Sequence, residues 1–75
     1  MENNIDQFVI DKVREKRQEK GMSQAELADS IDISRGFIGA VENPRQRAKY
    51  NLKLLNEIAK VLNCSIRDFF PENYL

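Results

Sequence analysis

Basic side chains gather in one stretch of this sequence, and their chemistry is that of phosphate binding. Residues 35–53 carry five basic side chains and one acidic one, a local net charge of +4, although the whole chain is neutral. The basic residues are Arg35, Arg45, Arg47, Lys49 and Lys53. Guanidinium and ammonium groups donate charge-assisted hydrogen bonds to phosphate oxygens. The stretch therefore predicts a phosphate-binding face, or else merely a solvated surface.

The sequence offers little material for catalysis or for a metal site. It has no histidine and one cysteine, Cys64, and we find no glycine-rich phosphate loop. Metal sites and catalytic centres need clusters of such residues, so we expect no enzyme, no metal and no cofactor. A lone cysteine forms no internal disulfide, and we interpret Cys64 as a small buried apolar residue. Without a signal-like N-terminus or a membrane-spanning apolar run, the expected location is the cytoplasm.

The basic stretch begins inside a segment, Ser23–Asn43, that predicts two short helices joined by a tight turn. Ser23 and Glu26 have the spacing of a capping box at the start of the first helix. Asp32 marks the turn and tolerates a left-handed conformation, and Ser34 is a suitable N-cap for the second helix. The residues expected to fill the corner are Leu27, Ile31, Ile33, Ile38 and Val41. This pattern is typical of a helix-turn-helix with a free outer face on its second helix.

The rest of the chain predicts three further helices around this corner. Apolar stripes with helical spacing begin at Ile5 and at Leu52, and the first of these helices is expected to end at Gly21. Residues 43–50 lack such periodicity and predict a loop. A short last helix is expected over residues 65–70, where Ser65 and Asp68 repeat the capping-box spacing.

The expected fold class is all-α, a compact five-helix arrangement in one domain. The domain spans residues 1–75, with its core in residues 5–70 and a short tail at residues 71–75. A core of this size supplies only about 3 to 5 kcal/mol of net stability, so either tight helix packing or a partner subunit should contribute.

The chain contains, in this order, the segments VREKRQEKGMSQAELA, FIGAVE and LLNEIAKVLNCSIRDFF, between Val13 and Phe70. Their order and spacing resemble the lambda repressor and Cro-like (XRE-type) family of helix-turn-helix transcriptional regulators. The resemblance implies a lambda repressor-like DNA-binding domain whose helix-turn-helix lies in the second and third helices. It also implies that the chain binds double-stranded operator DNA as a homodimer.

The resemblance further implies roles for individual residues. Arg17 and Glu42 match a structural salt bridge between the first helix and the end of the third. Gln24 matches a residue that contacts the DNA backbone beside the recognition helix. The positions that face the major groove in the family are occupied here by Ser34, Arg35, Gly36, Phe37, Gly39 and Ala40.

This recognition face departs from the family pattern, because few of its side chains can hydrogen-bond to bases. Arg35 is its one long polar side chain, and arginine can bind guanine O6 and N7 with two hydrogen bonds. Phe37 contacts either a thymine methyl group, the neighbouring core or a partner chain. Gly36 and Gly39 allow close approach of the backbone but read no base. Few hydrogen bonds to bases are therefore expected, and DNA shape is expected to contribute to specificity.

A second departure is the loop over residues 43–50, which is longer and more basic than the usual turn in the family. Arg45, Arg47 and Lys49 alternate along it, and Tyr50 follows. This composition suits contact with the DNA backbone, so we predict a phosphate clamp; the alternative is a merely soluble loop.

Two functions follow from these observations. The first is a repressor-like DNA-binding transcriptional regulator that docks its third helix in the major groove. The alternative is a protein-interaction module, antitoxin-like or antirepressor-like, that kept the fold without specific DNA binding. The neutral net charge and the sparse recognition face favour the alternative, whereas the basic stretch favours the first. A chain of 75 residues seldom provides an effector pocket, so no small-molecule effector is expected.

Overall fold

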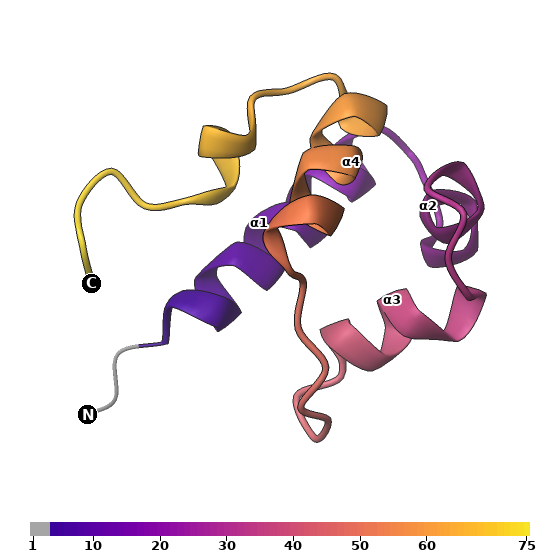
Figure 1. The fold of residues 1–75 in the computed structure, drawn as a ribbon, viewed down its shortest axis with the longest axis horizontal. Coiled ribbons are helices and arrows are strands. Elements are labelled where there is room, and N and C mark those ends of the chain that lie inside the picture. The colour runs from indigo at the N-terminus through magenta and orange to yellow at the C-terminus, as the bar shows by residue number, and fades with distance from the viewer. Residues whose placement is uncertain (1–3) are drawn as a thin grey trace.

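Residues 4–75, the part of the chain that the structure describes, form four α-helices and one short 3₁₀ helix in the computed structural model (Figure 1). The elements are α1 (Ile5–Glu19), α2 (Gln24–Ser30), α3 (Arg35–Glu42), α4 (Leu52–Leu62) and the 3₁₀ helix η1 (Ile66–Phe69). The all-α prediction is confirmed for these residues. The first three residues of the predicted 1–75 domain lie outside them.

The prediction of a fifth α-helix is wrong, because η1 is a single 3₁₀ turn. Its capping box is present: the Ser65 N–H donates to Asp68 Oδ2 at 3.1 Å, and the Arg67 N–H donates to Ser65 Oγ at 3.2 Å. The Phe70 N–H then donates to the Arg67 carbonyl at 3.1 Å, the i to i−3 bond of a 3₁₀ helix. Pro71 follows at once and has no N–H to donate, so no α-helical ladder forms.

Polar side chains cap the starts of three helices. Asn4 Oδ1, Ser23 Oγ and Asn51 Oδ1 accept hydrogen bonds from first-turn N–H groups of α1, α2 and α4 at 3.0, 3.0 and 2.8 Å. Glu26 Oε1 accepts from the Ser23 N–H at 2.8 Å, which completes the predicted capping box. The predicted end of α1 is also confirmed, because Gly21 adopts a left-handed φ of +69° just after the helix.

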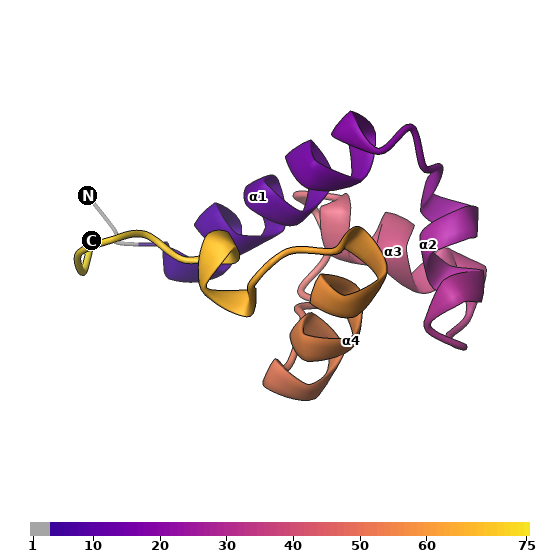
Figure 2. The ribbon, with the colours of Figure 1, turned by 90° about the horizontal axis from the view of Figure 1, so that it is seen from above.

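The core lies where α1, α4 and η1 meet the corner of α2 and α3. In both ribbon views α2 and α3 lie at one end of the molecule, and the C-terminal tail lies at the other (Figures 1 and 2). The buried apolar side chains are Val9, Ile10, Val13, Leu27, Ala28, Ile38, Val41, Leu55, Ile58, Ala59, Leu62 and Phe69. Burial of these side chains provides the main force that holds the short helices together.

Two residues that begin the predicted apolar stripes are exposed instead of buried. Ile5 is 43% exposed and Leu52 is 70% exposed. Each is the first residue of its helix, so the helical spacing is right but no neighbouring element covers that position. Ile10, by contrast, is buried.

No helix among residues 4–75 has the length and apolar character needed to cross a membrane. Over the same residues, no group of three or more potential metal-binding side chains comes together.

Candidate nucleic-acid interface

The corner between α2 and α3 is fixed by one left-handed residue and by buried apolar contacts. Asp32 adopts a φ of +58°, a conformation that aspartate tolerates better than most residues. The Ile33 N–H donates to the Ala28 carbonyl at 3.1 Å, which closes the turn. Ala28 and Ile38 are fully buried, so the two helices approach closely and α3 sits rigidly on α2.

A buried ion pair joins α1 to the end of α3. Arg17 Nη2 lies 3.1 Å from Glu42 Oε1, and the two side chains are 8% and 5% exposed. Arg17 Nη1 also donates to the Met22 carbonyl at 2.8 Å, and Gln24 Nε2 donates to the same Glu42 oxygen at 3.0 Å. The pair predicted to be structural therefore also anchors the side chain of Gln24, the predicted DNA-backbone contact.

The predicted recognition residues of α3 fall into two groups by exposure. Ser34, Arg35 and Gly36 are exposed, whereas Phe37, Gly39 and Ala40 are half-buried. Ser34 occupies the N-cap position, but its side chain makes no capping hydrogen bond. The accessible part of α3 is thus its first turn.

The two glycines of α3 have different surroundings. A Cβ atom at Gly36 would have no neighbour within 4 Å, so the backbone there is open to solvent. A Cβ atom at Gly39 would lie 3.2 Å from Gln24 Oε1. Gly39 therefore lets α3 pass close to the Gln24 side chain, a packing role that was not predicted from the sequence.

Arg35 is held by a carboxylate from the preceding helix. Its Nε donates to Asp29 Oδ1 at 3.1 Å, and its Nη2 donates to Asp29 Oδ2 at 2.8 Å. The side chains of Arg35 and Asp29 are 71% and 52% exposed. The hydrogen bonds from Arg35 lower the pKa of Asp29, so the carboxylate stays charged at neutral pH.

The basic loop between α3 and α4 starts with a tight turn. The Gln46 N–H donates to the Asn43 carbonyl at 3.0 Å, and Asn43 Oδ1 accepts from the Arg45 N–H at 2.9 Å. Arg45 and Arg47 are exposed, and neither forms an ion pair with another residue of the described chain. Both guanidinium groups are therefore available to an anionic partner.

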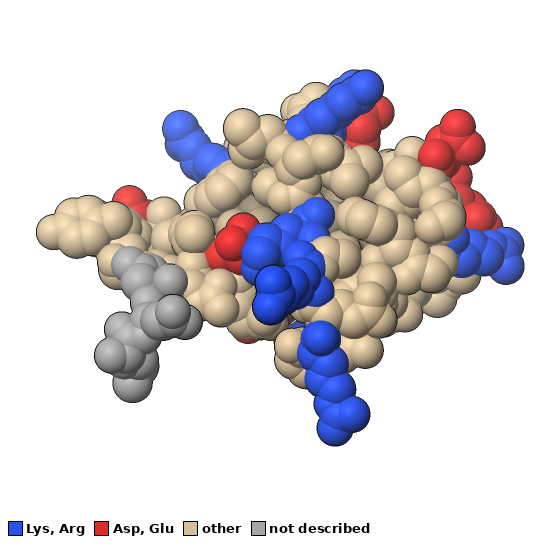
Figure 3. Space-filling model, turned by 60° about the horizontal axis from the view of Figure 1, so that its bottom comes forward, with Lys and Arg blue, Asp and Glu red and all other residues tan. Residues whose placement is uncertain are grey.

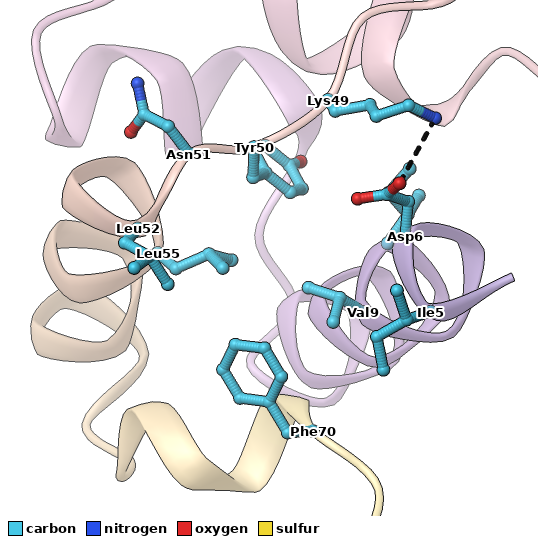
Figure 4. Close-up of a pocket in the computed structure, with 10 residues that line it drawn as sticks. Ile5, Asp6, Val9, Lys49, Tyr50, Asn51, Leu52, Leu55 and Phe70 are labelled. Atoms are coloured by element: carbon cyan, nitrogen blue, oxygen red, sulfur yellow. Dashed lines mark ion pairs between the residues drawn. The ribbon is translucent and has the colours of Figure 1, made fainter. Parts of the chain in front are cut away.

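Lys49, the third basic residue of the loop, is paired within the chain. Its Nζ lies 3.6 Å from Asp6 Oδ2 of α1, at the rim of a small pocket of about 280 Å³ (Figure 4). Figure 3 brings the lower edge of Figure 1 forward and shows Lys and Arg side chains near the middle of that face. The face is basic, but the Asp6 carboxylate partly neutralises the positive charge that Lys49 brings to it.

Tyr50 ends the loop with its ring turned inward, not toward solvent. Its ring centroid lies 6.3 Å from that of Phe37 with the planes tilted by 58°, and both rings pack against the core. This is the alternative in which Phe37 contacts the neighbouring core. The contact between Phe37 and Tyr50 joins α3 to the loop, so the two parts of the basic face are held together.

The buried position of Tyr50 predicts a specific alkaline response. Burial first, and then the nearby charge of Glu42, raise the pKa of Tyr50 well above its ordinary value. The unfolded chain loses this proton above about pH 10 while the folded chain keeps it, so stability falls as the pH rises past that value. In a Tyr74→Phe background, which leaves one tyrosine, tyrosinate absorbance should appear only when circular dichroism shows unfolding. Ionisation near pH 10 with an intact helical signal would contradict this assignment.

Two carboxylates, Asp6 and Asp29, pair with the basic face without a signal in the sequence. Asp6 lies 43 positions from Lys49, with α2 and α3 in between, and Asp29 lies six positions from Arg35, across the turn. Helical spacing rules relate only residues three or four apart, so neither pair has a local signal. The three-dimensional arrangement alone reveals them.

The fold and sequence have clear relatives. A family model described as Helix-turn-helix matches residues 13–69. An uncharacterized HTH-type transcriptional regulator of Archaeoglobus fulgidus is 39% identical over 61 residues, which cover 79% of this chain and 81% of the relative. The restriction-modification controller protein C.AhdI from Aeromonas hydrophila shares 28% identity with a TM-score of 0.72, over 84% of this chain and 92% of that one.

The same fold also occurs inside a longer protein that binds a substrate. The structure of Co(II) HppE with substrate matches with a TM-score of 0.76 and 25% identity, over 91% of this chain but only 37% of HppE. That likeness concerns a minor part of HppE, whereas the regulators match along most of their length. The chain belongs to the helix-turn-helix family of the XRE type, the lambda repressor and Cro-like family of DNA-binding transcriptional regulators.

Proposed function

We propose that this chain is a repressor-like regulator that docks α3 in the major groove of double-stranded DNA and binds the flanking phosphates with its basic loop. The observation that carries the proposal is the exposure of Arg35 in the first turn of α3 together with that of Arg45 and Arg47 in the loop that follows α3. In Figure 1, α3 and this loop lie along the lower part of the molecule. A helix in the major groove and cations beside it are the two parts that such docking requires.

Each part of the face has its own role in this proposal. Arg35 donates to a guanine, and the open backbone at Gly36 allows α3 to approach the base edges. Gln24 and the start of α2 contact a phosphate through the first-turn N–H groups that the capping box does not use, where the helix dipole also points outward. Arg45 and Arg47 bind the backbone on the other side of the groove.

We further propose that the chain acts in the cytoplasm as a homodimer on a two-fold site. Phe69 and Phe70 pack within the core of one chain and so are not candidates for this contact. Tyr74 is 96% exposed near the end of the chain and is the stronger candidate for a contact between subunits. Half-sites of such a dimer lie about 34 to 36 Å apart, one turn of the duplex.

One observation favours the alternative of a protein-interaction module. Arg35 and Lys49 both form ion pairs with carboxylates of the same chain, which reduces the positive charge offered to DNA. A protein partner bound without nucleic acid would support this second function. The free guanidinium groups of Arg45 and Arg47 weigh against it.

The role of the loop is tested by its salt dependence. We expect the Arg45→Ala, Arg47→Ala double variant to bind DNA more weakly. The slope of log K against log salt should become shallower by about 3.6 for the proposed dimer, because two phosphate contacts are lost in each subunit. The measurement is a fluorescence titration at several salt concentrations, which reports affinity and slope together.

A matched control for charge is Lys60→Ala. Lys60 is an exposed cation near the C-terminal end of α4, paired with Glu57 and outside the proposed interface. This variant should leave the slope unchanged. If the double variant at the loop also binds with the wild-type affinity and slope, the loop is not a phosphate clamp.

A further inference from the structure

The bond pattern between Asp29 and Arg35 leaves a defined set of donors on the arginine. A guanidinium carries five N–H groups in a rigid plane, one on Nε and two on each terminal nitrogen. Asp29 accepts from Nε at 3.1 Å and from Nη2 at 2.8 Å, so it occupies the side edge of that plane. The end edge keeps one N–H on Nη1 and one on Nη2, side by side.

This end edge matches the acceptors that guanine presents in the major groove. Guanine O6 and N7 lie next to each other and accept two parallel N–H groups from arginine. Arg35 stays 71% exposed despite its ion pair, and its two hydrogen bonds, both to Asp29, use the side edge and not the end edge. The backbone at Gly36, the next residue, is also open, which leaves room beside Arg35 for a base.

The ion pair between Asp29 and Arg35 contributes little to the stability of the fold. Asp29 and Arg35 are both exposed, and exposed ion pairs contribute little to stability. Its two-point geometry, however, restricts the orientation of a long and otherwise flexible side chain. A side chain ordered before binding loses less conformational freedom when it binds. A free arginine at this position could also turn toward a phosphate, which carries no sequence information.

We propose that Asp29 is a positioning residue that fixes the Arg35 guanidinium by its side edge so that the end edge meets a guanine. This inference rests on the proposed function and adds a specificity determinant on α2, outside the recognition helix. Loss of Asp29 then weakens discrimination at one base while overall attraction to DNA is kept or increased, because a negative charge near the phosphates is removed.

The test uses the site enriched by the full-length chain and a copy in which each guanine opposite Arg35 is replaced by 7-deazaguanine. That base keeps O6 but lacks the N7 acceptor. Wild type should bind the modified site about fivefold to 150-fold more weakly, because one of two hydrogen bonds is lost at the guanine of each half-site. The Asp29→Asn variant should show less than about a twofold difference between the two sites.

Asp32→Asn is the matched control. It removes the same charge from an exposed aspartate in the adjacent turn, and no bond joins Asp32 to Arg35. This control should keep the full wild-type discrimination. The change in DNA affinity of this control measures the purely electrostatic effect of losing one carboxylate. That change can then be subtracted from the change in affinity of Asp29→Asn.

The other outcomes separate this inference from the proposed function. Wild-type discrimination in Asp29→Asn would overturn the positioning role alone. If Asp29→Asn binds both sites more tightly than wild type and discriminates more strongly between guanine and 7-deazaguanine, the positioning role is also overturned. Asp29 would then hold Arg35 away from the base instead of toward it. Wild type and Arg35→Ala could each bind the guanine site and the 7-deazaguanine site with equal affinity. Arg35 would then read no guanine, and that part of the proposed function would fail together with this inference.

Discussion

Glu42→Ala is expected to lose most or all of its folded population at room temperature. The substitution leaves Arg17 charged and buried without its carboxylate partner, and it also removes the acceptor of the Gln24 amide. Removal of one member of a buried ion pair typically costs about 3 to 5 kcal/mol. A domain of this size has a net free energy of unfolding of about the same magnitude, so the variant would have little or no stability left. Thermal unfolding followed by circular dichroism measures the effect.

The control for this prediction is the same change at an exposed ion pair. Glu15 is 56% exposed and pairs with Lys12 along α1. Glu15→Ala should change the free energy of unfolding by less than about 0.5 kcal/mol, as surface substitutions usually do. A Glu42→Ala variant that melts at the wild-type temperature would show that the Arg17–Glu42 pair does not hold α1 to α3.

Arg35→Ala is expected to have the largest effect on DNA binding of any single substitution on the basic face. A bidentate contact from arginine to guanine contributes about 1 to 3 kcal/mol of discrimination. In the proposed dimer each subunit makes this contact, so the loss is about 2 to 6 kcal/mol, or about 30-fold to 20,000-fold in affinity. The variant should also accept any base where wild type requires guanine. Titrations against the preferred site and against sites altered at that base measure both effects.

A matched variant separates base reading from general charge. Arg14 is an exposed arginine of α1 that pairs with Asp11, and its replacement by alanine removes the same charge. Arg14→Ala should retain the base preference, and both variants should melt like wild type because both side chains are exposed. Equal losses in the two variants would assign the effect of Arg35 to charge alone.

The helix ends of this protein could be predicted from the sequence because capping is local chemistry. The Ser23–Glu26 box, the left-handed Gly21 and the Asn51 cap each depend on residues within three or four positions. The same logic failed for the last helix. The Ser65 box was found, but Pro71 leaves room for only a single 3₁₀ turn after it.

Burial was less predictable at helix starts, because it depends on neighbours that are distant in the sequence. Ile5 and Leu52 fit their helical stripes, yet they begin α1 and α4 at the open pocket and stay partly exposed (Figure 4). Helical spacing identifies which side of a helix is apolar. It does not show where along the helix the covering element ends.

The candidate interface could be predicted as a set of residues but not as an arrangement. Arg35, Arg45 and Arg47 are exposed as a binding face requires, whereas Phe37 and Tyr50 pack inward on each other. An aromatic residue in a polar loop is compatible with either position. The hydrophobic core beneath α3 determines that both rings face inward, and the position of this core cannot be read from the linear sequence.

Selection from random DNA sequences tests the central claim most directly, namely that α3 reads bases as part of a dimer. With the full-length chain at low salt, we expect enrichment of a two-fold site whose half-sites are centred about 10 base pairs apart. Each half-site should contain a required guanine. Failure to enrich any sequence at low salt would contradict the claim, and the protein-interaction function would then be the better account of this chain.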